Sequence, residues 1–203
     1  MSRIDSLEAL EALYGPAKPA SLAKELDRLT PEYAALVEAA PFVVIATIGP
    51  NGADASPRGD PAPVARVLDE RTVAIPDRRG NNRIDSLRNI VADPRVALLF
   101  LIPGVGETMR ISGTASIETE PALLDRFAMR GSRPVSVLLV TVERAYFQCQ
   151  KALVRSRLWD PEAQVERGSL PSAGRILEGI SAGGIDGAEY DAGYGERMRR
   201  ELY

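Results

Sequence analysis

Residues 108–118, TMRISGTASIE, decide the fold class, because their side chains alternate between apolar or small and polar over the whole segment. A period of two is typical of a β-strand with one buried and one exposed face. The predicted buried set is Met109, Ile111, Gly113, Ala115 and Ile117. We therefore predict a long strand that lies on a hydrophobic core.

The flanking segments also indicate strands, most of them joined by short turns. Residues 95–102 form a near-continuous apolar run, which is typical of a central strand. Pro50-Asn51-Gly52 is a turn signal between two such segments. Further strands are predicted at residues 42–49, 53–59, 63–69, 72–76, 135–143 and 144–150. Because hairpins dominate over parallel units, the predicted class is mainly β with helices (α+β), closed as a small antiparallel barrel.

Three segments are expected along the chain: a helical N-terminal extension over residues 1–40, the barrel over 41–160 and a C-terminal helical appendage over 161–203. In the extension, helices are predicted over residues 7–15, around residues 21–29, and from Pro31 with Thr30 as N-cap. The appendage has helical spacing and three tyrosines, so we expect it to pack on the barrel or on a partner, with disorder as the alternative.

Composition excludes several classes of function. The net charge is −3 and the pI is near 5.2, so no nucleic-acid partner is expected. The chain has no histidine and one cysteine, Cys149, which argues against a metal site, a disulfide framework and histidine-based nucleophile pairs. No apolar run approaches the ~20 residues of a membrane span, and no signal peptide is recognisable. A cytoplasmic protein without membrane contact is the expectation.

Residues 74–90, AIPDRRGNNRIDSLRNI, concentrate hydrogen-bond donors between a predicted strand and a predicted helix. Asn82 is expected to cap a helix whose first turn exposes Arg83 and Ser86. The buried stripe of this helix is predicted to be Ile84, Leu87, Ile90 and Val91. With Arg79 nearby, the free amides of the helix start would complete a phosphate pocket. The alternative is a solvated turn before a charged helix.

Two other segments carry clustered donors. In residues 56–61, SPRGDP, Arg58 stands among restricted backbone positions, and Asp60 is expected to orient its guanidinium. A strand end with a solvent-exposed arginine is the alternative. In residues 149–159 the pattern suggests a stacking and anion-binding face or an interface anchor, carried by Lys151, Arg155, Arg157 and Trp159.

Taken in order, these segments resemble the pyridoxamine 5′-phosphate oxidase-like family of FMN-binding split β-barrels, over roughly residues 40–160. ASPR at 55–58 resembles the family's strand-end Ser-x-Arg, and TVAIPD at 72–77 is similar to its strand beside the flavin. Residues 80–100 resemble its signature helix leading into the central strand, and residues 106–117 resemble the strand that contacts the cofactor of the other subunit.

The resemblance implies a small antiparallel split β-barrel, a homodimer with FMN at its interface, and specific ligands. It implies that the phosphate is held by Arg58, Arg83 and Ser86, that the ring edge lies along Ile75, Pro76 and Asp77, and that Thr108 contributes across the interface. Lys151 or an arginine of residues 151–157, Arg155 or Arg157, is the candidate for a positive charge near the flavin ring.

The same resemblance implies an FMN-dependent oxidoreductase with a small-molecule substrate. The segment at 154–160, VRSRLWD, only loosely echoes the family's substrate-phosphate segment, which argues against pyridoxamine phosphate as that substrate. Two alternatives remain open: a non-catalytic flavin-binding or flavin-buffering protein, and a deazaflavin-dependent reductase on the same fold.

Overall fold

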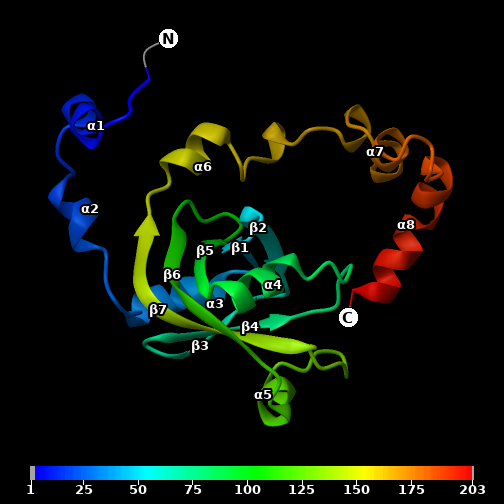
Figure 1. Cartoon of the computed structure of the whole chain (residues 1–203), viewed down its shortest axis with the longest axis horizontal. Coiled ribbons are helices and arrows are strands. Elements are labelled where there is room, and N and C mark those ends of the chain that lie inside the picture. The colour runs from blue at the N-terminus through cyan, green and yellow to red at the C-terminus, as the bar shows by residue number, and fades with distance from the viewer. Residues whose placement is uncertain (1–2, 203) are drawn as a thin grey trace.

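The computed structural model describes residues 3–202 and contains one seven-stranded sheet (Figure 1). The strands run β1 (Phe42–Gly49), β2 (Gly52–Gly59), β3 (Arg66–Asp69), β4 (Thr72–Asp77), β5 (Arg95–Leu101), β6 (Thr108–Glu118) and β7 (Ser136–Gln148). Their order across the sheet is β2-β1-β5-β6-β7-β4-β3, and each neighbouring pair is antiparallel. The predicted antiparallel class is therefore confirmed.

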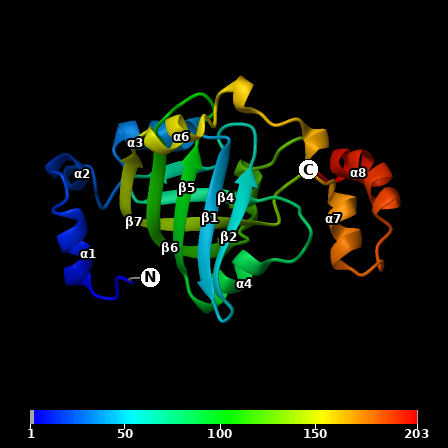
Figure 2. The ribbon, with the colours of Figure 1, turned by 90° about the horizontal axis from the view of Figure 1, so that it is seen from above.

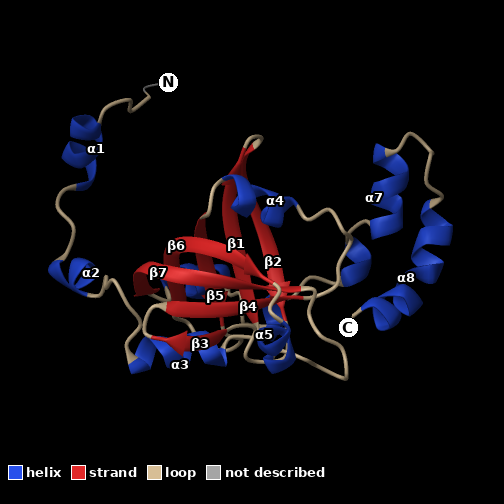
Figure 3. Cartoon of the chain, turned by 60° about the horizontal axis from the view of Figure 1, so that its bottom comes forward, coloured by secondary structure: helices blue, strands red, loops and turns tan. Residues whose placement is uncertain are grey.

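The sheet curls strongly without closing through hydrogen bonds, and its edges in the described chain are β2 and β3 (Figure 3). The result is a split barrel with an open side. Its core contains the predicted face of β6, because Met109, Ile111 and Ala115 are buried and Ile117 packs against the same cluster. Residues 135–143 and 144–150, predicted as two strands, are mostly one long strand, β7, bulged at Glu143.

Helices cover parts of the barrel and extend from it. They are α1 (Leu7–Tyr14), α2 (Pro19–Ala23), α3 (Pro31–Ala39), α4 (Asp85–Ala92), α5 (Pro121–Arg126), α6 (Lys151–Ser156), α7 (Ala173–Ile180) and α8 (Gly187–Glu201), with short 3-10 turns at Pro161–Ala163 and Arg167–Ser169. Thr30 caps α3 as predicted, accepting the amide of Tyr33. The buried Tyr33 and Val37 fix α3 to the barrel core.

The second predicted helix, around residues 21–29, is wrong in its extent. The helix α2 ends at Ala23, and Leu26 instead pairs with Ala145 of β7 through two backbone hydrogen bonds. The half of β7 beyond its pairing with β4 offers free backbone groups, and this bridge satisfies two of them. Tertiary pairing thus replaces the local helical preference.

The start of α4 also differs from the prediction. The helix begins at Asp85 after Ile84, which has a left-handed backbone (φ 50°), so Asn82 is not its N-cap. The buried face turns accordingly: Ser86 and Ile90 are buried, whereas Ile84 is exposed and Val91 is 79% exposed. The predicted stripe is therefore correct for Ile90 and, in part, for Leu87, but wrong for Ile84 and Val91, and the prediction of an exposed Ser86 is wrong.

The two ends of the chain project from opposite sides of the barrel (Figures 1 and 2). The helices α1 and α2 lie on one side, and the hairpin of α7 and α8 lies on the other. The close approach of these last two helices requires glycine, because a Cβ on Gly174 would lie 2.0 Å from the carbonyl oxygen of Gly187. Among the described residues, none of these helices is long and apolar enough to cross a membrane.

Candidate functional site

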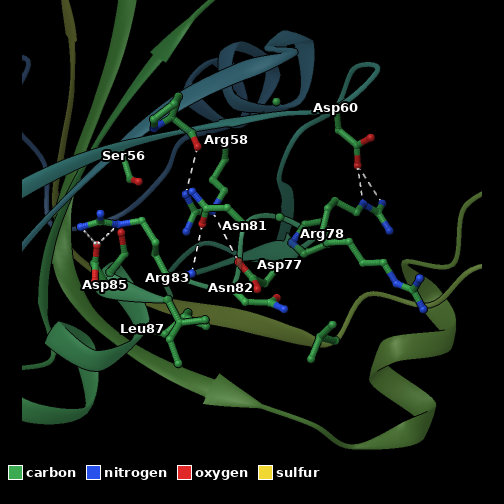
Figure 4. A pocket seen from close by; sticks show the side chains of 18 of the residues that line it. Ser56, Arg58, Asp60, Asp77, Arg78, Asn81, Asn82, Arg83, Asp85 and Leu87 are labelled. Atoms are coloured by element: carbon green, nitrogen blue, oxygen red, sulfur yellow. Dashed lines mark hydrogen bonds and ion pairs between the residues drawn. The ribbon is translucent and has the colours of Figure 1, made fainter. Parts of the chain in front are cut away.

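A cavity of about 560 Å³ opens where the end of β2, the end of β4 and the start of α4 meet (Figure 4). Its walls carry four arginines and four aspartates together with small and polar groups. The lining includes Asp54, Ser56, Arg58, Asp60, Pro76, Asp77, Arg78, Arg79, Asn81, Asn82, Arg83, Asp85 and Ser86. Its volume lies in the range of small-molecule pockets, roughly 300–1,000 Å³.

The edge strand β2 supplies three polar side chains to this cavity at every second residue. Asp54, Ser56 and Arg58 lie opposite buried positions of β1, so they face the inside of the barrel. Residues between them face the other way because successive side chains of a strand alternate. Because β2 is an edge strand with polar side chains on its inner face, a polar ligand can contact the inside of the barrel at this point.

Arg58 and Asp77 form an ion pair inside the cavity, with 3.5 Å between Nε and Oδ1. Arg58 also donates from Nη1 to the carbonyl oxygen of Pro57 at 2.9 Å. Burial raises the pKa of the Asp77 carboxyl, and the neighbouring Arg58 guanidinium offsets part of that rise. The pair therefore holds a half-buried positive charge whose partner ionises less readily than an ordinary aspartate.

The expected pairing of Asp60 with Arg58 is replaced by a pair with Arg78. Arg78 contacts Oδ2 of Asp60 through Nε at 2.8 Å and through Nη2 at 2.7 Å, and Nη1 donates to the carbonyl oxygen of Phe127. The Asp60 side chain is 2% exposed. This buried pair ties the end of β2 to the segment after β4, so its first role is to shape the cavity wall.

The loop between β4 and α4 carries the two arginines nearest to solvent. Arg83 contacts Oδ2 of Asp85 through Nε and Nη2, both at 2.8 Å, and its side chain is 74% exposed. Asn81, rather than Asn82, stabilises the turn by accepting the amide of Arg83 at 3.1 Å. In residues 3–202, Arg79 has neither a side-chain hydrogen bond nor an ion pair, so its charge is available to a ligand.

The start of α4 faces the cavity. Ser86 is buried and donates from its hydroxyl to Oδ2 of Asp54 at 3.2 Å. Deeper along the helix, Asn89 donates to the hydroxyl of Thr47 and fills the space above Gly49, where a Cβ would lie 1.9 Å from the Asn89 side chain. Across residues 3–202, no side chain caps the first amides of α4, so they remain free for an anion.

Figure 4 shows the Arg83–Asp85 pair on one side of the cavity, the Arg78–Asp60 pair on the other, and Arg58 between them. A dianionic group entering between these pairs would meet guanidinium donors from two chain segments and the free amides of α4. The arrangement is suited to bind a phosphate or a similar anion at the mouth, with Pro76 beside it on the wall. Among the described residues, no group of three potential metal ligands is present.

Eight of the twelve predicted site residues line this cavity: Arg58, Asp60, Pro76, Asp77, Arg79, Asn82, Arg83 and Ser86. The other four do not line it within one chain. Ile75 points into the core, and Thr108 is buried at the start of β6. Lys151 and Arg155 lie exposed on α6. Contacts of Thr108, Lys151 and Arg155 with a flavin bound by a second subunit stay a prediction.

Sequence reasoning missed Asp54, Ser56, Arg78 and Asn81 at this site. The first two were detectable, since they precede Arg58 at intervals of two on a predicted strand. Arg78 could not be distinguished from the adjacent Arg79 in the sequence. Arg78 turns inward because it pairs with Asp60, a contact that only the folded chain brings about.

Fold and site together define a split-barrel protein with a cavity lined by arginines and aspartates at the open side of its sheet. The family model described as pyridoxamine 5′-phosphate oxidase matches residues 29–149, more than half of the chain. The chain belongs to the pyridoxamine 5′-phosphate oxidase family. No curated protein matches the chain at a significant level.

Solved structures with a similar arrangement include HupZ from Group A Streptococcus, at 22% identity and a TM-score of 0.49, covering 60% of this chain and 94% of that one. An FMN-binding protein from Syntrophomonas wolfei matches at 11% identity and a TM-score of 0.46, covering 70% and 95%. An FAD-binding protein from Mycobacterium smegmatis matches at 16% identity and a TM-score of 0.42, covering 61% and 97%.

Proposed function

We propose that this protein binds FMN in the cavity between β2, β4 and α4 and acts as an FMN-dependent oxidoreductase on a small molecule. The observation that carries the proposal is the cavity itself, where Arg58, Arg79 and Arg83 surround the uncapped start of α4. Family membership supports a flavin as the ligand.

The residues present fit a flavin monophosphate. Arg79 has no side-chain partner in residues 3–202 and can bind the phosphate without breaking a contact. Arg83 would give up its exposed ion pair with Asp85 to bind the phosphate. Exposed ion pairs contribute only about 0.2–1 kcal/mol, so that exchange costs little. The Ser86 hydroxyl and the α4 amides add neutral donors, and Pro76 with Asp77 borders the space for the ring. Asp54 faces the same space and accepts hydroxyl donors such as Ser86.

A bound flavin would supply hydride transfer, which side chains cannot perform themselves. The chain's own contribution would be to bind the phosphate, to orient the ring and to place positive charge near it. Of the carboxyls that line the cavity, Asp77 has its pKa raised by burial, which makes it the candidate for holding a proton there.

We also propose a homodimer, formed through the outer face of β2, β1 and β5. This face is apolar across three strands in register: Phe42, Val44, Ala46 and Ile48 of β1 lie beside Ala53, Ala55 and Pro57 of β2 and beside Ala97, Leu99 and Leu101 of β5. Phe42 and Ile48 are exposed, and so is Ala97. A contiguous exposed apolar face of this kind marks an interaction surface, and a twofold partner would cover it.

The experiment for the proposed function is a spectrum and a mass measurement of the small molecule that co-purifies with the protein. Oxidised flavin absorbance and the mass of FMN are expected, and a deazaflavin would contradict the cofactor assignment. Turnover with a reduced nicotinamide under air then distinguishes an enzyme from a flavin-buffering protein. Reduction of bound FMN without any turnover would contradict the proposed oxidoreductase activity.

A further inference from the structure

The N-terminal helix α1 has an apolar stripe with nothing to cover it. Leu7, Leu10, Leu13 and Tyr14 share one side of the helix, and all four are exposed, as is every residue of α1. Isolated helices shorter than about 12–15 residues are marginal in water, so an eight-residue helix needs a packing partner. The chain supplies none to it within residues 3–202.

A second uncovered stripe lies on the C-terminal half of α8. Tyr194, Met198 and Leu202 follow one another at intervals of four, and each is at least 44% exposed. The same side of α8 packs on α7 through Gly187 and Asp191, whose carboxylate accepts hydrogen bonds from the Ser172 hydroxyl and the Gly174 amide. The stripe is therefore the continuation of an established helix contact beyond the end of the shorter α7.

The two stripes carry complementary charges. The helix α1 contains Glu8 and Glu11 and no basic residue, a net charge of −2. The end of α8, residues 194–202, carries three arginines against the two glutamates Glu196 and Glu201, a net charge of +1. Among these arginines, Arg199 has no side-chain partner in the described residues. Glu8 and Glu11 likewise lack a side-chain partner in the described chain. Net charges of opposite sign on α1 and on the end of α8 favour pairing of these two helices over self-association of either.

We propose that α1 docks on the C-terminal half of α8 of a second copy of this chain. Within one chain the two elements lie on opposite sides of the barrel, so they do not reach each other (Figures 1 and 2). In a symmetric dimer the exchange occurs twice, and each copy covers both stripes of the other. Docking at α8 is separate from the flavin cavity and needs no flavin.

Engineered disulfides test the pairing directly. In a Cys149→Ser background, Leu10→Cys and Met198→Cys are introduced separately and co-expressed, then oxidised. A covalent dimer of the two variants is expected, and neither variant expressed alone should give one. The matched control is Leu10→Cys co-expressed with Val91→Cys, since Val91 is an equally exposed apolar residue on the barrel. The control should stay uncrosslinked.

Hydrogen exchange gives a second readout that depends on no new bond. The α1 amides should exchange at least tenfold more slowly in the wild type than in Met198→Asp, although the substitution lies in another helix. Val91→Asp should leave the α1 amides as slow as in the wild type. Equal crosslinking with Val91→Cys, no covalent dimer after oxidation of the co-expressed Leu10→Cys and Met198→Cys variants, or unchanged α1 exchange in Met198→Asp would each overturn the proposal. A dimer by light scattering without the crosslink overturns the arm exchange and leaves the sheet-face dimer standing.

Discussion

Replacing Arg83 with alanine should weaken FMN binding without disturbing the fold. The side chain is 74% exposed, and within residues 3–202 Asp85 is its one side-chain partner, so its loss removes little from the apoprotein. A charge-assisted contact to the phosphate contributes about 1.5–3 kcal/mol. Releasing Asp85 subtracts about 0.2–1 kcal/mol from that gain.

The net loss is about 0.5–2.8 kcal/mol, which corresponds to a roughly 2- to 100-fold rise in the FMN dissociation constant. Isothermal calorimetry at fixed ionic strength measures it. Asp85→Asn should act in the opposite direction, because it removes both the competing partner of Arg83 and a negative charge near the phosphate.

The matched control is Arg95→Ala. Arg95 also contacts an aspartate two residues away, Asp93, and is 70% exposed, yet it does not line the cavity. FMN affinity should be unchanged in this variant. An equal loss in Arg83→Ala and Arg95→Ala, or no loss in either, would refute the assignment of Arg83 to the phosphate.

Three further predictions concern stability and assembly. Because burial raises the folded-state pKa of Asp77, its contribution to stability is present at low pH and is lost as the pH rises through that raised pKa. Asp77→Asn should therefore raise the Tm at about pH 7 and make the fall of Tm with rising pH shallower. A variant with the same Tm as the wild type at both ends of a titration from about pH 3 to 7 would contradict this prediction. Ile84→Asn should stabilise the apoprotein by about 1 kcal/mol in urea unfolding, since asparagine tolerates the left-handed backbone that strains isoleucine. A loss of stability would show that contacts of the Ile84 side chain contribute more to stability than its backbone strain costs. Phe42→Glu should convert the proposed sheet-face dimer to a monomer in light scattering, while Val91→Glu should not.

Much of the barrel could be predicted from the sequence because local patterns determine it. The alternation of residues 108–118, the turn at Pro50-Asn51-Gly52 and the Thr30 cap each depend on neighbours within a few positions, and the structure confirms each of them. The class of the fold followed from these signals together.

The details of the site could not be predicted because contacts between distant segments determine them. Ser86 is buried and donates to Asp54, which lies 32 residues away in the sequence, so the local pattern could not reveal this contact. Arg78 turns inward because Asp60 lies there, whereas the adjacent Arg79 stays exposed. Residues 21–29 have helical spacing, but the free backbone of β7 recruits Leu26 instead.

Comparing the binding of FMN with that of riboflavin shows whether the cavity at the start of α4 binds a terminal phosphate. Calorimetry on the apoprotein should give FMN an affinity at least tenfold higher than riboflavin, because one charge-assisted phosphate contact already contributes about 1.5–3 kcal/mol. The difference should shrink as salt is added, since the donors Arg79 and Arg83 are exposed. Equal affinities for riboflavin and FMN would show that this cavity does not hold the phosphate.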